Sequence, residues 1–131
     1  MKSRIRSLSA ISQIRDQALQ ERSVELNRMQ SHLSQIHQVR KELDRVRVEE
    51  CRVTMIEALP YVGRFLGNIQ AEDDRAAAAE VQVTRMIETK REEVLSAWRD
   101  VRSVNHVLGS VNQRMAEQAA RAEAAATDER N

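Results

Sequence analysis

Few side chains in this sequence have a type and spacing that could carry out chemistry. Of the three histidines, His32 and His37 are five residues apart and His106 lies far along the chain, whereas paired metal ligands on one helix face are four apart. The single cysteine, Cys51, has no accompanying base and orienting group of the kind that activates a nucleophile. No glycine-rich phosphate-binding loop is present. We therefore expect a protein that is not an enzyme, with no metal and no cofactor, and Cys51 as a helix-packing thiol.

The composition is typical of long helices rather than of a compact enzyme. The chain has 131 residues, of which 41% are hydrophobic, 31% are charged and only 2% are aromatic. Compact cores use aromatic side chains to fill volume, and a disordered chain would be less apolar. A charged, aliphatic, aromatic-poor sequence is characteristic of coiled coils.

The charge, the hydrophobic pattern and the cysteine content limit the partners and the cellular compartment that we expect. The 21 basic and 20 acidic residues give a net charge of +1, which argues against a nucleic-acid partner, because phosphate binding requires a basic excess. No apolar run approaches the roughly 18 residues that span a bilayer, so we expect no membrane insertion. A single cysteine suits a reducing compartment, and we expect a cytoplasmic protein.

Glycine and proline mark the organisation of the chain. Residues 1–59 contain neither, Pro60, Gly63 and Gly67 fall close together, and only Gly109 follows. These residues disfavour helix interiors, so we predict one all-α domain over residues 1–131: two long helices forming an antiparallel coiled-coil hairpin, monomeric on its own. Helix one is expected over about 3–58, the turn over about 59–68, and helix two to about 126. Pro60 as the first residue of helix two, Asn68 as its cap, and a parallel dimer of one kinked helix remain alternatives.

Hydrophobic periodicity supports this hairpin. In helix two, alternating steps of four and three residues from Val62 to Ala125 meet apolar side chains except at Asp73, Glu80, Lys90 and Gln118, which predicts a coiled-coil seam. Helix one is less regular, and its apolar residues predict three frames. Ile5, Leu8, Ile11 and Ile14 follow a spacing of three, and a central frame has Arg22 and Arg40 at seam positions. A shifted frame then contains Val46, Val53 and Ile56. The central frame comprises Leu19, Leu26, Met29, Leu33, Ile36 and Leu43.

Each end of the predicted hairpin has a distinctive composition. Residues 1–15 contain four basic side chains and no acid, which indicates a solvated helix face, a basic collar that docks on an acidic protein, or a mitochondrial transit peptide. At the turn, Tyr61 and Phe65 gather with aliphatic residues. This cluster either plugs the end of the seam or forms an exposed binding patch.

With these features in place, the chain resembles the FliJ/YscO family, the central-stalk proteins of flagellar and virulence type III secretion ATPases. The segments that carry the resemblance are YVGRFLGNI (61–69), VLSAWRDVRSVNHVL (94–108) and QRMAEQAARAEAAATDE (113–129). The family similarly has an aromatic-led turn, a tryptophan midway along helix two and an acidic C-terminal end. Pro60, Gly63 and Gly109 depart from the flagellar pattern, so the flagellar and virulence branches both stay open.

The resemblance implies a non-enzymatic coiled-coil stalk of a type III protein-export apparatus, peripheral to the inner membrane. It implies a terminal end that docks in the hexameric secretion ATPase, a tip that contacts the cytoplasmic domain of the export gate, and binding of secretion chaperones. The ATPase-docking residues would be Arg4, Arg6, Arg15, Arg114 and Arg121. The tip residues would be Met55, Tyr61, Phe65, Leu66 and Ile69. The alternative is an unrelated cytosolic coiled-coil adaptor or scaffold that binds partners along its flank.

Overall fold

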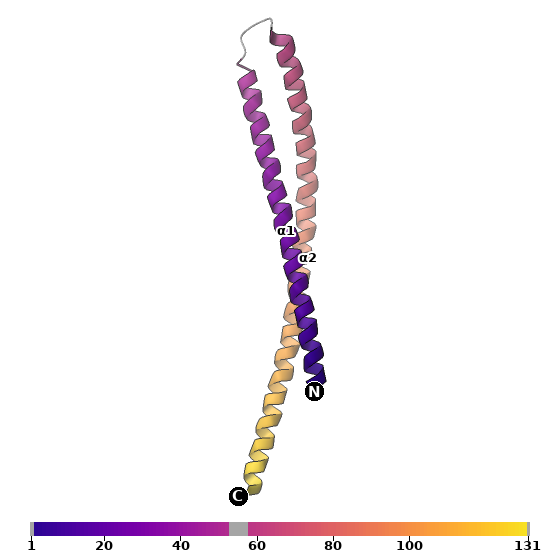
Figure 1. The fold of residues 1–131 in the computed structure, drawn as a ribbon, viewed down its shortest axis with the longest axis vertical. Coiled ribbons are helices and arrows are strands. Elements are labelled where there is room, and N and C mark those ends of the chain that lie inside the picture. The colour runs from indigo at the N-terminus through magenta and orange to yellow at the C-terminus, as the bar shows by residue number, and fades with distance from the viewer. Residues whose placement is uncertain (1, 53–57, 131) are drawn as a thin grey trace. The chain divides into compact units, whose positions relative to one another are not determined.

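The chain forms two long antiparallel helices (Figure 1) in the computed structural model, which describes residues 2–52 and 58–130. Helix α1 runs over Lys2–Glu50 and helix α2 over Leu59–Arg130. Residues later in α1 pair with residues earlier in α2: Ser12 contacts Asn105, and Arg40 contacts Asp73. The predicted all-α helical hairpin is therefore confirmed.

The chain divides into two compact units. Residues 24–92 form the loop unit, which contains the end of α1 and the beginning of α2, and residues 2–23 with 93–130 form the terminal unit. In the loop unit, Ile36, Val83 and Ile87 are buried together. Half-buried apolar residues of both helices pack against these three: Leu26, Met29, Leu33, Ala76 and Ala79.

The α2 seam follows the predicted four-and-three spacing. Every position of that frame from Val62 to Met115 is buried or half-buried, and Asp73, Glu80 and Lys90 are included among them. Beyond Met115, the frame positions Gln118, Ala122 and Ala125 are exposed. The periodicity therefore identified the packed face of α2 within both units.

The frame of α1 differs from the prediction at its beginning. Ile11 is 41% exposed and Ile14 is 64% exposed, whereas Ser12 is half-buried. Repeated steps of three residues rotate backwards around a helix of 3.6 residues per turn and leave the packed face after one or two steps. The seam instead continues from Leu8 to Ser12 in the same frame as the central part of α1. The predicted spacing of three is therefore wrong beyond Leu8.

The end of α1 also differs from the prediction. Val46 is half-buried, but Val53 and Ile56 lie outside the described residues. α1 ends at Glu50, not near residue 58, and the Cys51 and Arg52 amides donate hydrogen bonds back to the carbonyls of Arg47 and Glu49. No glycine or proline marks this end in the sequence.

The predicted turn at 59–68 is helical and belongs to α2, which also continues to Arg130 rather than ending near residue 126. Pro60 lies in the first turn of α2, where a missing amide hydrogen costs no helical hydrogen bond. Gly63 and Gly67 follow inside the helix, and no described glycine has a positive φ. A glycine costs a helix about 1 kcal/mol relative to alanine, which the packing of a long helix overcomes. The turn was misplaced because breakers weaken a helix without always ending it.

We expect Ile87→Ala to destabilise the hairpin by about 2–3 kcal/mol, because Ile87 is 4% exposed at the centre of the loop-unit core. Val81→Ala, at a position 52% exposed on the same helix, should change stability by less than about 0.5 kcal/mol. Urea unfolding followed by circular dichroism measures both. Equal losses for the two variants would show that the packed face is assigned wrongly.

Candidate functional site

A charged cluster in the loop unit lies inside the seam and connects the two helices. Arg40 of α1 donates hydrogen bonds to Asp73 at 2.9 and 3.4 Å and to Glu80 at 2.6 Å, both on α2. His37 Nε2 lies 3.1 Å from the other carboxylate oxygen of Glu80. Asp73 and Glu80 are seven residues apart, so they occupy equivalent seam positions on either side of the arginine. One guanidinium therefore joins two turns of the opposite helix.

The electrostatics of the cluster favour the charged forms of its members. Hydrogen bonds from Arg40, and then its positive charge, hold the pKa of Asp73 below its ordinary value. The pKa of Glu80 is likewise lowered, first by Arg40 and then by His37. The hydrogen bonds to Asp73 and Glu80 raise the pKa of Arg40 above its ordinary range. The three side chains are half-buried, between 27% and 37% exposed, so water still reaches them and moderates the cost of burying charge.

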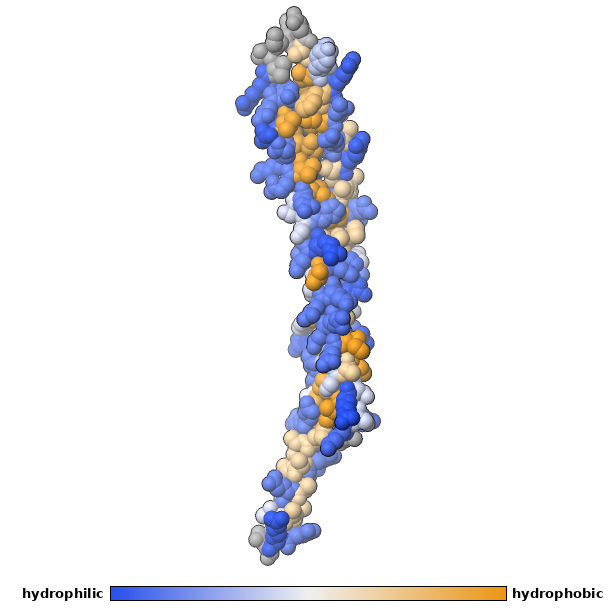
Figure 2. All heavy atoms as spheres, in the orientation of Figure 1, coloured by the Kyte–Doolittle hydropathy of each residue, from blue (hydrophilic) through white to orange (hydrophobic). Residues whose placement is uncertain are grey.

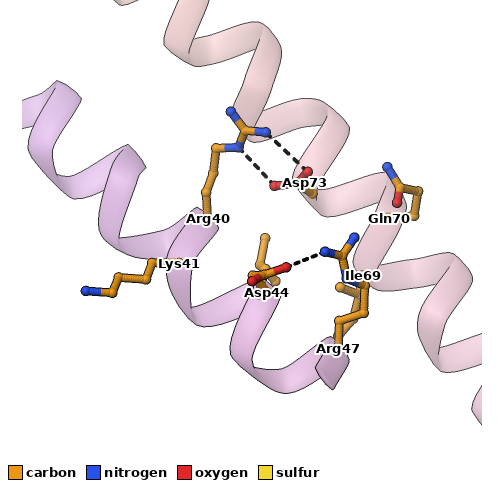
Figure 3. Close-up of a pocket in the computed structure, with 8 residues that line it drawn as sticks. Arg40, Lys41, Asp44, Arg47, Ile69, Gln70 and Asp73 are labelled. Carbon is orange, nitrogen blue, oxygen red and sulfur yellow. Dashed lines mark hydrogen bonds and ion pairs between the residues drawn. The ribbon is translucent and has the colours of Figure 1, made fainter. Parts of the chain in front are cut away.

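A groove of about 300 Å³ lies beside the cluster in the loop unit, between α1 and α2. Figure 3 shows Arg40 directed across to Asp73, whereas Asp44 and Arg47 pair with each other along α1. Four of the five charged side chains that line the groove are thus already paired within the chain, and the fifth, Lys41, points away from them in Figure 3. This arrangement fixes how α1 lies against α2 in the loop unit.

Further polar pairs connect the helices in both units. In the terminal unit, Arg15 lies 3.4 Å from Asp100, and Arg22 lies 3.4 Å from Glu93. Ser12 donates a 3.1 Å hydrogen bond to Asn105 in the same unit. In the loop unit, Lys90 lies 3.0 Å from Glu25. Three of the four polar residues that interrupt the α2 seam, Asp73, Glu80 and Lys90, are thus matched by charged residues on the opposite helix.

The sequence places Arg40 on the seam of one helix and Asp73, Glu80 and Lys90 on the seam of the other. It does not show which of these residues pair. The available signal was the seven-residue spacing of Asp73 and Glu80, which places two acids on one seam. Pairing them with Arg40 requires the register between the helices, which periodicity within either helix does not contain.

The predicted tip residues have different exposures. Tyr61 is 73% exposed and Phe65 is 39% exposed, and both line one shallow groove at the start of α2 with Glu50. Ile69 is 7% exposed and Leu66 is half-buried, so both belong to the seam. Met55 lies outside the described residues. Figure 2 shows an apolar strip between two hydrophilic flanks in the loop unit. The side chains open to a partner are therefore the two aromatic ones.

The five predicted ATPase-docking arginines all lie in the terminal unit, and all are exposed: Arg4, Arg6, Arg15, Arg114 and Arg121. Contacts of Ser12 with Asn105 and of Arg15 with Asp100 place residues 2–15 beside the stretch 101–116. Neither stretch contains an acidic residue. The fold thus joins two acid-free segments into one basic surface, and Arg15 within it pairs with Asp100 just outside it. Arg121 lies beyond this surface, among acidic neighbours.

The remaining candidate residues do not form a shared site in the described part of the chain. His32 and His106 are exposed on different helices, and Cys51 is exposed after the end of α1. Among residues 2–52 and 58–130, no group of three histidine, cysteine or carboxylate side chains could hold a metal ion. Over the same residues, neither helix has a stretch long and apolar enough to cross a membrane.

Comparison with known proteins adds no relative: no family model, no curated protein and no solved structure matches this chain.

We expect Arg40→Met to lower the melting temperature more than Arg45→Met does. Arg40→Met leaves Asp73 and Glu80 facing the seam without their shared cation, whereas Arg45 pairs only with Glu42 and Glu49 of its own helix. The triple variant Arg40→Met/Asp73→Leu/Glu80→Leu should regain the lost stability, because an apolar seam needs no charge partner. Thermal unfolding by circular dichroism tests the order. An unchanged melting temperature in Arg40→Met would show that the cluster does not help to hold the helices together.

The folded state should become less stable at acidic pH, partly because Asp73 and Glu80 in this cluster become protonated. The pKa values of Asp73 and Glu80 are lowered in the folded state from ordinary values of 3.8 and 4.5. Their contribution is therefore complete above those ordinary values and is lost as the pH falls through the lowered ones. Melting temperatures measured from pH 7 to pH 2 should drop less steeply below about pH 5 in Asp73→Asn/Glu80→Gln than in the parent. If the melting temperatures of the parent and the variant fell equally with pH, Asp73 and Glu80 would not contribute to the acid sensitivity.

Proposed function

We propose that this chain is a non-enzymatic coiled-coil stalk of a type III protein-export apparatus, of the flagellar or the virulence kind, as its resemblance to the FliJ/YscO family implies. It docks the end that carries its termini in the hexameric secretion ATPase and contacts the cytoplasmic domain of the export gate with its tip. In doing so it promotes ATP hydrolysis by the ATPase and export of substrates delivered by chaperones. It works at the cytoplasmic side of the inner membrane.

The observation that carries the proposal is the pair of exposed aromatic side chains at the start of α2. Tyr61 and Phe65 are two of the three aromatic residues of the chain. They lie on α2 beside a seam that contains Leu66 and Ile69, yet they remain largely outside it. Aromatic side chains are common anchors of protein interfaces. An exposed aromatic pair where the two helices are joined supports a contact with a protein partner at that point.

The terminal unit supports the second contact. Its acid-free surface carries Arg4, Arg6 and Arg114, and none of them has an ion pair within residues 2–52 and 58–130. Arginine binds carboxylates in a bidentate manner. The surface therefore suits an acidic protein partner, and the secretion ATPase takes that role in the proposal.

The tip is tested by Phe65→Ala, measured against the export-gate domain and the secretion ATPase of the same organism. Loss of an aromatic anchor typically costs about 2 kcal/mol or more, so we expect affinity for the gate domain to fall at least about 30-fold. Helicity and stimulation of the ATPase should stay close to those of the parent. Val81→Ala, at an exposed position on the same helix, is the matched control and should leave gate binding unchanged.

The terminal unit is tested by Arg4→Glu/Arg6→Glu in the same assays. We expect weaker stimulation of ATP hydrolysis with normal gate binding, and added salt should reproduce the loss because exposed charge pairs are screened. The parent's failure to bind either partner would favour an unrelated adaptor or scaffold over a stalk.

A further inference from the structure

The single tryptophan of the chain lies on the outer surface of α2 in the terminal unit. Trp98 is 45% exposed and Leu95, one turn earlier, is 46% exposed. The guanidinium carbon of Arg102 lies 5.0 Å from the centroid of the Trp98 ring, within the range of a cation–π contact. Arg99 is exposed beside them. We call these four residues, Leu95, Trp98, Arg99 and Arg102, the Trp98 surface.

The four side chains share one helix face by their spacing. Positions three, four and seven residues apart lie next to one another on an α-helix, so the Trp98 surface covers two turns. The seam residues Val94, Ala97 and Val101 are half-buried against the opposite helix, which leaves the Trp98 surface outside the seam. The hairpin itself therefore makes little use of its largest apolar side chain.

This surface carries two arginines and no acid, and the exposed Glu92 lies one turn before Leu95. Among the described residues, neither Arg99 nor Arg102 has an ion pair, and the neighbouring Asp100 is paired with Arg15 instead. Residues 101–116 contain no acid. An apolar centre of tryptophan and leucine beside two available guanidinium groups is complementary to a ligand that is both apolar and acidic.

We propose that the Trp98 surface binds an acidic amphipathic α-helix of another protein. A footprint of two turns on a straight helix matches two turns of a second helix that packs beside it. Apolar side chains of the partner cover Trp98 and Leu95, and its flanking carboxylates pair with Arg99 and Arg102. The inference goes beyond the proposed function, which uses the start of α2 and the arginines Arg4, Arg6 and Arg114, although Arg102 also lies in the acid-free stretch 101–116.

The experiment uses the full chain and a designed probe. The probe is a fluorescein-labelled 21-residue helical peptide with leucine along one face and glutamate on both flanks, and a second peptide has lysine in place of every glutamate. Because Trp98 is the only tryptophan, protection of its fluorescence from acrylamide reports binding at this surface. We expect saturable binding and protection with the glutamate peptide and neither with the lysine peptide.

Variants locate the binding site. Trp98→Ala should weaken binding of the glutamate peptide about 30-fold, which corresponds to about 2 kcal/mol, and Arg99→Glu/Arg102→Glu should weaken it at least as much. Arg85→Glu, an exposed arginine of the same helix in the loop unit, is the matched control and should bind like the parent. All four side chains are exposed, so helicity should remain unchanged in every variant.

Three results would overturn the proposal. The first is equal binding of the two peptides, and the second is parental affinity in Trp98→Ala or in the double variant. The third is stronger protection of Trp98 by vesicles of phosphatidylglycerol and phosphatidylcholine, or by a single-stranded oligonucleotide, than by the glutamate peptide. That result would assign the surface to an anionic lipid or nucleic-acid ligand.

Discussion

A hairpin of two helices can bury only the strip of each helix that faces the other. Among the described residues, only Ile36, Ile69, Val83 and Ile87 are buried. Such a strip repeats every seven residues, so the helices could slide by one repeat and still match apolar with apolar. The helices keep a single alignment only if some interaction prevents that slip. In the loop unit this is the Arg40 guanidinium between Asp73 and Glu80.

The cluster suits this role because its members are only half-buried. A charged group taken fully out of water would cost more than one partner returns, whereas partial hydration keeps that cost small. A slip of one repeat would separate Arg40 from one of its two carboxylates, which would then face the seam alone. The cluster thus contributes more to the choice of register than to the total stability, as polar seam residues do in other coiled coils.

The same geometry explains why the candidate binding surfaces lie on the outside of the helices. With one seam per unit, most side chains of both helices face solvent, and apolar residues on those faces are only partly covered by the chain. Tyr61 and Phe65 at the start of α2 and Trp98 further along it are the three aromatic residues, and all three are exposed. Aromatic side chains that the seam does not use are available to other proteins, which is the basis of both proposals.

The sequence alone determined the helical class, the hairpin and the packed face of α2, because a regular seven-residue pattern records which side of a helix is buried. It misplaced the turn, since Pro60 and two glycines fit inside the first turns of α2 and α1 ends without a breaker. It also placed Ile11 and Ile14 in the seam, although Ser12 occupies that position. Only the tertiary structure shows that Arg40 pairs with Asp73 and Glu80. The same is true of the acid-free stretches 2–15 and 101–116, which it brings side by side. Both depend on the register between two helices, and no local pattern in either helix encodes the position of the other.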